Sequence, residues 1–161
     1  MKYIFYYNTK IGRIGMEENG VAITRLDFIN KDAQEEIIEK QETVLLKEAI
    51  KQLNEYLDGK RTLFDLPLEP KGTEFQKKVW NALKEIPFGE TRSYGEIAKI
   101  IGNEKASRAV GMANNKNPIA IIVPCHRVIG ANGKLVGYAG GLDLKEKLLK
   151  LESKNDKLII E

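Results

Sequence analysis

Residues 93–115 read SYGEIAKIIGNEKASRAVGMANN, and this stretch predicts how the second half of the chain is organised. Ser93 and Glu96 form a capping box, a pattern that marks the start of a helix. The Gly-Asn pair that follows this helix is typical of a tight turn, and helical spacing of apolar residues resumes over residues 104–114. Two short helices joined by a glycine-containing turn predict a helix-turn-helix.

The second of these helices is predicted to have an outer face made mainly of small residues. Ala106, Val110 and Ala113 share the side that we expect to pack inward. The other side carries Ser107, Arg108, Gly111, Asn114 and Asn115. With Arg108 as its only long side chain, this face suits close approach and insertion of one residue, as in proteins that enter the minor groove of DNA. Tight packing against another helix is the alternative.

The elements on either side of the helix-turn-helix follow from the same kinds of signal. Thr73 and Gln76 form a capping box that begins an earlier helix. Residues 119–123 form an apolar run typical of a strand, and residues 130–137 are typical of a hairpin tip or wing. A final helix is predicted over residues 142–151.

The first half of the chain predicts strands followed by one helix. Three short runs are typical of strands: Lys2–Asn8, Ile11–Glu17 and Val21–Phe28. Asn19-Gly20 is a strong hairpin signal, residues 30–42 are polar without a clear period, and Thr43–Leu57 is an amphipathic helix. The proline-containing stretch Leu66–Gly72 predicts a linker.

Length and composition are those of a soluble globular protein. The 161 residues suffice for one large domain or two small ones, and the linker divides them into domains 1–69 and 70–161. No apolar run approaches the roughly 20 residues that span a bilayer, and the N-terminus lacks the features of a signal peptide. We therefore expect a cytoplasmic protein with no membrane partner.

Charge is distributed unevenly along the chain. Residues 1–69 carry ten basic and thirteen acidic residues, whereas residues 70–161 carry sixteen and ten. From Lys105 to Leu142 there are five basic residues and no acidic one. Such a segment suits contact with a phosphate backbone, and a solvated basic face is the alternative.

The sequence contains one cysteine, Cys125, and one histidine, His126, side by side. A single cysteine excludes an intramolecular disulfide, and this pair alone argues against a zinc site, so we expect no metal and no cofactor. A free thiol has a pKa of about 8.5, so a nucleophilic cysteine needs a base or a nearby positive charge. His126 and Arg127 are candidates, although neighbours on a strand point to opposite faces and a lone cysteine is usually buried and inert.

The string Pro124-Cys125-His126-Arg127-Val128 resembles the active-site signature of the O6-alkylguanine-DNA alkyltransferases, also called methylated-DNA–protein-cysteine methyltransferases. Four other segments resemble the same family in the same order: GETRSY at 89–94, SRAVG at 107–111, Asn117-Pro118 and GYAGGL at 137–142. The resemblance covers about residues 73–152, and residues 1–69 match only loosely, in size and in strand-then-helix order. It implies an α+β fold: a small ribonuclease-H-like antiparallel sheet with a helix, then a winged helix-turn-helix domain that carries the active-site cysteine.

What the resemblance implies about function is a repair reaction on double-stranded DNA. The family binds the minor groove, rotates the damaged nucleotide out of the stack and transfers the alkyl group from O6 of guanine to the cysteine, here Cys125. His126 would relay the cysteine proton through a water, and Glu152 would orient His126. Asn117 would tie the recognition helix to the active-site segment. O4-alkylthymine is left open as a second substrate, and we expect a monomer.

The resemblance also implies which residues hold the DNA. Arg108 would fill the space that the rotated nucleotide leaves, and Tyr94 would crowd the flanking phosphate. The guanine pocket would be lined by Val128, Tyr138, Ala139 and Gly140. DNA contacts are expected from Ser93, Tyr94, Ser107, Arg108, Ala109, Gly111, Asn115 and Arg127. Taken without the resemblance, Glu152 is an ordinary surface carboxylate and Tyr94 a partly buried core tyrosine.

This sequence departs from the family at two places. Ala139 stands where some members have serine, which removes a hydroxyl that can donate to the guanine oxygen. Asn114 and Asn115 replace bulkier or charged residues found in some relatives, which affects how the end of this helix packs or meets the backbone.

The product of the implied reaction, an S-alkylcysteine, is a thioether that water does not attack, and no second cysteine can accept the group. We therefore expect one turnover for each molecule. Three rival functions remain open at this point: a cysteine hydrolase that uses Cys125 and His126, a non-catalytic sensor of alkylated bases, and a helix-turn-helix transcription regulator.

Overall fold

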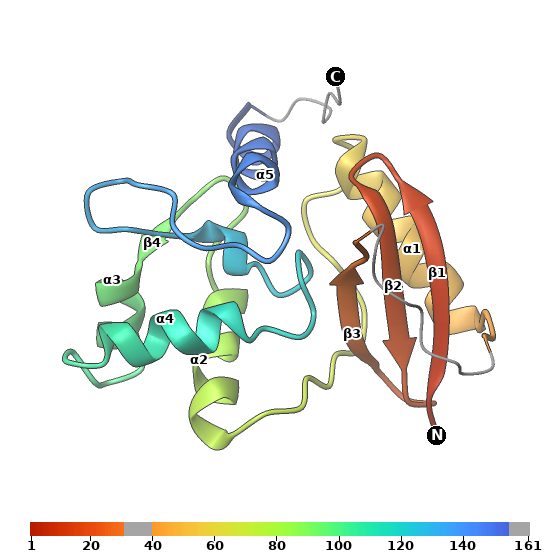
Figure 1. Ribbon diagram of the computed structural model, residues 1–161, viewed down its shortest axis with the longest axis horizontal. Coiled ribbons are helices and arrows are strands. Elements are labelled where there is room, and N and C mark those ends of the chain that lie inside the picture. Colours follow the sequence, from red (N-terminus) through yellow and green to blue (C-terminus); the bar gives the residue numbers. More distant parts are fainter. Residues whose placement is uncertain (31–39, 155–161) are drawn as a thin grey trace.

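The computed structural model describes residues 1–30 and 40–154, and its elements form two groups that lie side by side (Figure 1). The N-terminal group consists of β1 (Tyr3–Thr9), β2 (Gly12–Glu18), β3 (Ile23–Phe28) and α1 (Val44–Leu57). The second group consists of α2 (Glu74–Lys84), β4 (Arg92–Ser93), α3 (Tyr94–Ile100), α4 (Ser107–Asn115), the 3-10 turn η1 (Cys125–Arg127), β5 (Val128–Ile129) and α5 (Leu142–Lys154). Most of the polar stretch predicted at 30–42 lies outside the described residues. An antiparallel sheet with one helix, followed by a mainly helical group, confirms the predicted α+β architecture.

The N-terminal sheet is antiparallel in the order β1-β2-β3, and the predicted strands are confirmed to within two residues at their ends. The Asn19-Gly20 turn between the second and third strands is also confirmed. The Asn19 side-chain oxygen accepts from the backbone N–H groups of Val21 and Ala22, and Gly20 has a φ of 93°, which favours glycine.

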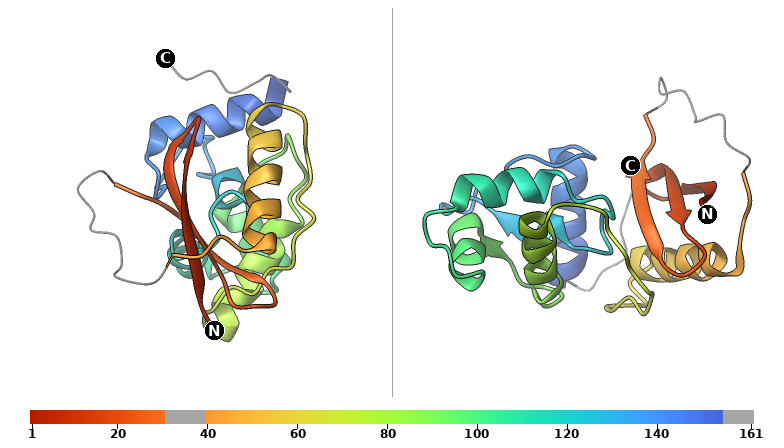
Figure 2. Two further views of the ribbon diagram at one scale, coloured as in Figure 1. Left: turned by 90° about the vertical axis from the view of Figure 1, so that its right-hand side faces the viewer. Right: turned by 90° about the horizontal axis from the view of Figure 1, so that it is seen from below.

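Helix α1 covers one face of this sheet (Figure 2). Its predicted start is confirmed, because the Thr43 hydroxyl accepts from the backbone N–H of Leu46 at 3.2 Å. Its inward stripe, which includes Leu46, Leu53 and Leu57, is fully buried in the same hydrophobic core as the helices of the second group. The two groups therefore share one continuous core.

The outer edge of β3 is covered by two segments of the chain. The linker pairs with it, because Ile23 N–H donates to the Pro67 carbonyl at 2.8 Å and Glu69 N–H donates to the Ile23 carbonyl at 2.9 Å. Further along, Leu26 N–H donates to the Pro118 carbonyl at 2.9 Å. These bonds satisfy an edge that would otherwise be open to other strands, and they fix the segment after α4 against the sheet.

The two capping boxes, at Thr73 for α2 and at Ser93 for α3, are both confirmed. Helix α4 begins at Ser107, about three residues later than expected. Backbone bonds from Asn103 N–H to the Ala98 carbonyl and from Ala106 N–H to the Asn103 carbonyl extend the turn between the helices up to this point.

The prediction of a strand at residues 119–123 is wrong. The segment is a buried turn in which Val123 N–H donates to the Ile119 carbonyl at 3.0 Å, and Ile121 has a φ of 69°, a strained value for a β-branched residue. The run is as apolar as a buried strand because the turn, too, lies inside the core.

The segment at 130–137 contains a turn closed by a bond from Gly130 N–H to the Lys134 carbonyl at 2.8 Å. Strand β5, which precedes it, pairs in parallel with β4. Helix α5 then runs over the top of the second group in Figure 1 and extends three residues beyond its predicted end. Within the described ranges, no helix is long and apolar enough to cross a membrane.

Candidate functional site

Cys125 begins the short turn η1, where the chain leaves the buried turn at 119–123 and passes Pro124. The cysteine is free and only 7% exposed. The turn packs against α2 and α5, and Asn114 of α4 donates to the Cys125 carbonyl, so elements that are distant in the sequence meet at this cysteine.

Asn117 holds the segment that leads to Cys125. Its side-chain oxygen accepts from Ile119 N–H at 3.1 Å, and its amide nitrogen donates to the Val123 carbonyl at 2.8 Å. One side chain thus closes both ends of the buried turn, which explains why these residues do not extend into a strand. The position is compatible with the hinge predicted for Asn117.

Asn114 does not lie on the outer face of α4, where we expected it. Its side chain is 2% exposed, and its amide nitrogen donates to the Cys125 carbonyl at 3.4 Å. A second residue therefore links the recognition helix to the active-site turn. The Asn114 side-chain oxygen has no hydrogen-bond partner among residues 1–30 and 40–154.

His126 and Glu152 form the buried centre of the site. His126 Nε2 lies 2.7 Å from Glu152 Oε2, and neither side chain is more than 1% exposed. His126 Nδ1 has no hydrogen-bond partner in the part of the chain that the structure describes. With Nε2 engaged by a carboxylate, Nδ1 is the nitrogen that can accept a proton.

Arg127 is buried rather than exposed, so its predicted role as a DNA contact is corrected. Its Nε donates to Glu152 Oε1 at 2.7 Å, and its two terminal nitrogens donate to Glu152 Oε2 at 3.0 Å and to the Ile86 carbonyl at 2.7 Å. The guanidinium also lies 5.8 Å from the centre of the Phe88 ring. Three of its five N–H groups are bonded inside the protein, and the residue is 8% exposed, so Arg127 is placed as a partner of Glu152 rather than on the surface.

These partners set the charge states of the pair. Burial alone would raise the pKa of Glu152, but hydrogen bonds and charge from His126 and Arg127 outweigh it and lower that pKa to about 2. Burial lowers the pKa of His126, and the contact with Glu152 opposes this shift only in part. The site therefore holds an ionised carboxylate beside a neutral imidazole at neutral pH.

Burial also raises the pKa of the Cys125 thiol, and two groups oppose the shift: the Asn117 side-chain amide and the positive charge of Lys145. The thiol is thus largely protonated at rest, so its reaction requires that the proton be taken away as the sulfur attacks.

Lys145 is a site residue that the sequence did not single out. It is completely buried, and its ammonium donates to the Val128 carbonyl at 2.7 Å and to the Val136 carbonyl at 2.8 Å. It fastens the loop at 130–141 to the strand that follows Cys125. One signal in the sequence could have found it: Lys145, Leu148 and Glu152 are spaced by three and four residues, which places them on the same face of a helix.

Two predicted pocket residues lie around this centre. The Tyr138 ring packs edge-on against His126 with 6.4 Å between ring centres, and its hydroxyl has no partner within the described residues. Val128 is fully buried, and its carbonyl accepts from the Lys145 ammonium.

The other two predicted pocket residues, Ala139 and Gly140, lie on the loop beyond Tyr138. Ala139 is exposed. A Cβ built at Gly140 would lie 2.5 Å from a Leu144 methyl carbon and 3.2 Å from the Phe28 ring, so any larger residue must displace its neighbours.

Tyr94 is half-buried at the start of α3 and lies between α4 and the loop. Its hydroxyl donates to the Val136 carbonyl at 3.4 Å, and a Cβ built at Gly111 would lie 3.7 Å from its ring. Burial and, to a smaller degree, the charge of the Cys125 thiolate raise the pKa of Tyr94. The structure therefore brings Tyr94 to the side of the site that α4 borders. Ser93 is partly exposed, and its hydroxyl caps α3.

The exposed face of α4 carries the remaining predicted DNA contacts. Arg108, Ala109 and Asn115 are exposed, and Ser107 and Gly111 are partly exposed. Met112 is 70% exposed on the same helix, so Arg108 is not the only long side chain there, contrary to our reading of the sequence.

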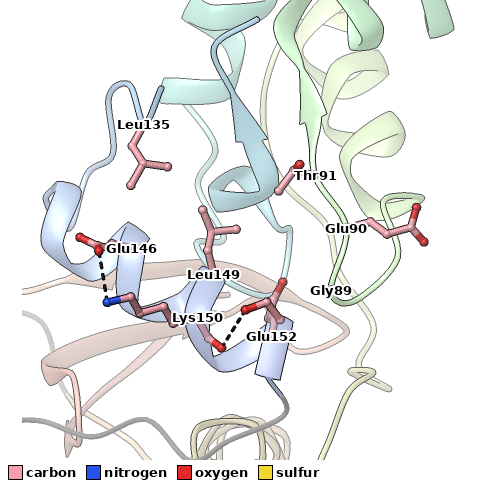
Figure 3. Close-up of a pocket in the computed structure, with 9 residues that line it drawn as sticks. Gly89, Glu90, Thr91, Leu135, Glu146, Leu149, Lys150 and Glu152 are labelled. Atoms are coloured by element: carbon pink, nitrogen blue, oxygen red, sulfur yellow. Dashed lines mark hydrogen bonds and ion pairs between the residues drawn. The ribbon is translucent and has the colours of Figure 1, made fainter. Parts of the chain in front are cut away.

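No group of three or more histidine, cysteine, aspartate and glutamate side chains in the described residues could hold a metal ion. A surface hollow of about 230 Å³ lies between α5 and the loop at 89–91 (Figure 3). Glu152 borders it together with apolar residues such as Leu135 and Leu149, but Cys125 and His126 do not line it. We assign this hollow no part in the reaction.

The charge states predict how stability depends on pH. Because the pKa of His126 is lower in the folded protein than its ordinary value of 6.5, the unfolded chain binds a proton first as the pH falls. We expect the free energy of unfolding to be highest above pH 6.5 and to fall below it, by up to about 1.4 kcal/mol for each pH unit. Urea titrations from pH 8 to pH 5 would measure this, and His126→Gln should flatten the curve. Stability that rises between pH 7 and pH 5.5 would contradict the prediction.

Two family models together match nearly the whole chain. Residues 1–70 match the ribonuclease-like domain of 6-O-methylguanine DNA methyltransferase, and residues 74–154 match its DNA binding domain. A methylated-DNA–protein-cysteine methyltransferase of Methanosarcina acetivorans is 57% identical over 93% of this chain and 97% of its own length. The protein of the same name from Methanosarcina barkeri is 54% identical over 93% and 98%.

Solved structures agree with this similarity. The Mycobacterium tuberculosis protein OGT in complex with DNA superposes with a TM-score of 0.88 at 46% identity, covering 96% of this chain and 94% of that one. An O6-methylguanine DNA methyltransferase from Methanococcus jannaschii superposes with a TM-score of 0.71 at 31% identity, over 98% and 96% of the two chains.

Proposed function

The chain belongs to the 6-O-methylguanine DNA methyltransferase family, and from that premise we propose how its buried residues carry out the reaction. It is a DNA-repair protein that binds DNA and transfers an alkyl group to a cysteine. Cys125 is the only cysteine in the sequence and is therefore the acceptor. The proposal rests on two observations. Cys125, His126 and Glu152 are all buried, with His126 in contact with Glu152. Asn117 holds the segment that leads to Cys125.

The reaction is a displacement at the alkyl carbon. The Cys125 sulfur forms a bond to that carbon as the bond to O6 of guanine breaks. Because the thiol is protonated at rest, its proton passes to His126 Nδ1, through a bridging water, as the sulfur attacks. Glu152 holds the Nε2–H tautomer and stabilises the imidazolium that forms. The guanine leaves as a neutral base after it takes up a proton from solvent, and His126 returns the thiol proton to solvent, so the reaction consumes and releases no net proton.

We propose that the substrate is O6-alkylguanine in double-stranded DNA, approached from the minor groove by a monomer. The exposed start of α4 supports this, because its small residues permit close approach and Arg108 can enter the space of a rotated nucleotide. We infer that a rotated base reaches Cys125 between Tyr94, which borders α4, and Tyr138, whose ring packs against His126. O4-alkylthymine as a second substrate remains a prediction.

We also propose that the two parts of the chain have different roles. Residues 70–161 bind DNA and accept the alkyl group, whereas residues 1–69 support them. A location in the cytoplasm stays a prediction from the sequence. A cysteine hydrolase is disfavoured. Its acyl thioester would be cleaved by water and the cysteine regenerated, whereas the family transfers an alkyl group that stays on the sulfur.

One measurement tests the proposed function. The protein is mixed with an excess of duplex DNA that contains O6-methylguanine, and the intact protein is weighed by mass spectrometry. We expect each molecule to gain one methyl group in place of a hydrogen, and Cys125→Ala to gain none. Repeated demethylation of DNA by unmodified protein would refute the single-turnover mechanism.

The spent protein is expected to be less stable than the free protein. Cys125 is 7% exposed and lies among buried neighbours, so an added alkyl group must displace them. Overpacking of this kind costs about 1–3 kcal/mol. Melting temperatures of the two forms, separated from DNA, measure the difference. Identical values would show that the site already has room for the group.

A further inference from the structure

Glu152 has a third partner, and it comes from the N-terminal group. The hydroxyl of Tyr56, near the end of α1, donates to Glu152 Oε2 at 2.6 Å. This is the same oxygen that lies 2.7 Å from His126 Nε2. The two residues are 96 positions apart in the sequence, and the end of α1 lies beside the last turns of α5 (Figures 1 and 2).

The position of the Tyr56 hydroxyl is fixed by packing. The side chain is 1% exposed, and its ring contacts Phe64 with 5.4 Å between ring centres and Phe88 with 6.3 Å. Phe88 also lies against the Arg127 guanidinium. The ring cannot rotate away from Glu152 without disturbing residues that hold the other side of the carboxylate, so the hydrogen bond is built into the core.

The Glu152 carboxylate thus interacts with three side chains. Arg127 uses both oxygens, whereas Tyr56 and His126 share Oε2. A hydroxyl that donates to an oxygen withdraws electron density from it, so less charge remains to stabilise a protonated imidazole. The charged and titratable groups around the pair are Tyr56 of α1, Cys125 and Arg127 of η1, Tyr138 of the loop at 130–141, and Lys145 of α5.

We propose that Tyr56 is a positioning residue of the His126–Glu152 pair: its hydroxyl holds Oε2 in line with His126 Nε2 and limits the negative charge that His126 experiences. The N-terminal group then does more than support the fold, because it contributes one of the groups that set the proton affinity of the imidazole. The consequence for alkyl transfer rests on the role proposed above for His126 as the acceptor of the thiol proton.

Tyr56→Phe keeps the ring and removes only the hydroxyl. The chain offers a matched control in Tyr7→Phe, because the Tyr7 hydroxyl donates to Glu42 Oε2 at the same distance, 2.6 Å, in the same group of elements but away from Cys125. His126 is the only histidine, so histidine NMR signals of an untagged protein report it alone. Titrations of both variants and of the wild-type protein give the midpoint of its protonation.

We expect Tyr56→Phe to raise the His126 midpoint by about half a pH unit and Tyr7→Phe to leave it unchanged. On the acid side of the rate profile, alkyl transfer should then be about threefold slower in Tyr56→Phe. An equal or lower midpoint in Tyr56→Phe, or the same rise in both variants, would overturn the proposal.

The two parts of the experiment separate this inference from the proposed function. A raised midpoint with an unchanged rate profile would leave the coupling between Tyr56 and the pair in place and would remove His126 as the acceptor of the thiol proton. Both variants lose one tyrosine–glutamate hydrogen bond, so a loss of melting temperature common to both reports stability alone.

Discussion

Replacing Glu152 with glutamine is expected to destabilise the protein by about 3–5 kcal/mol, because it leaves the buried Arg127 guanidinium without its counter-charge. The carboxylate is 1% exposed and accepts from Arg127 through both oxygens, so the guanidinium would lose two charge-assisted hydrogen bonds inside the core. The variant should also react slowly with alkylated DNA, since His126 loses the negative charge that stabilises its protonated form. Urea unfolding at pH 7.5 measures the first effect, and single-turnover rates measure the second.

A paired variant separates the lost charge from the altered shape. Arg127→Met keeps a long side chain against Phe88, and in Arg127→Met/Glu152→Gln the glutamine oxygen can still accept from Tyr56 and His126. We expect the double variant to be more stable than Glu152→Gln by roughly 2 kcal/mol, because it buries no unpaired charge. Destabilisation that simply adds across the two single variants would show that the ion pair is not the cause.

Local signals in the sequence predicted the helices and turns well, and the reason is physical. Thr73, Ser93 and Asn19 act on backbone groups two or three residues away, so their neighbours alone determine what they do. The prediction failed at residues 119–123, where the run of apolar residues is equally consistent with a strand and a buried turn. The side chain of Asn117 decides between them, and its bonds to Ile119 and Val123 are visible only in three dimensions.

The reacting residues could be predicted only because a family resemblance placed them, and their surroundings could not be predicted even then. Arg127 lies in a basic segment and was taken for a DNA contact, but its carboxylate partner is 25 residues away. Tyr56 sits on the inward stripe of an amphipathic helix, where it is indistinguishable from an ordinary core residue. A sequence pattern gives the face on which a side chain lies, whereas partners from distant elements depend on the tertiary fold.

Replacing Arg108 with alanine is expected to slow alkyl transfer from duplex DNA on the order of 100-fold. The estimate follows from the proposed role of Arg108, because a side chain that fills the space of a rotated base offsets a few kcal/mol of unstacking, and each 1.4 kcal/mol is tenfold in rate. Arg108 is exposed in the first turn of α4, away from the buried cluster, so the substitution should leave the reactivity of Cys125 itself unchanged.

Two comparisons make this prediction decisive. O6-benzylguanine as a free base needs no rotation out of a duplex, so Arg108→Ala should react with it at close to the wild-type rate. Lys105→Ala removes an exposed positive charge just before the same helix and should weaken DNA binding mainly at low salt. If Lys105→Ala slowed repair of the duplex as much as Arg108→Ala, the loss in Arg108→Ala would come from weaker electrostatic attraction to DNA and not from a lost wedge. A loss on the free base equal to that on the duplex would place Arg108 in the chemistry of the pocket, because only a wedge discriminates between a stacked base and a free one.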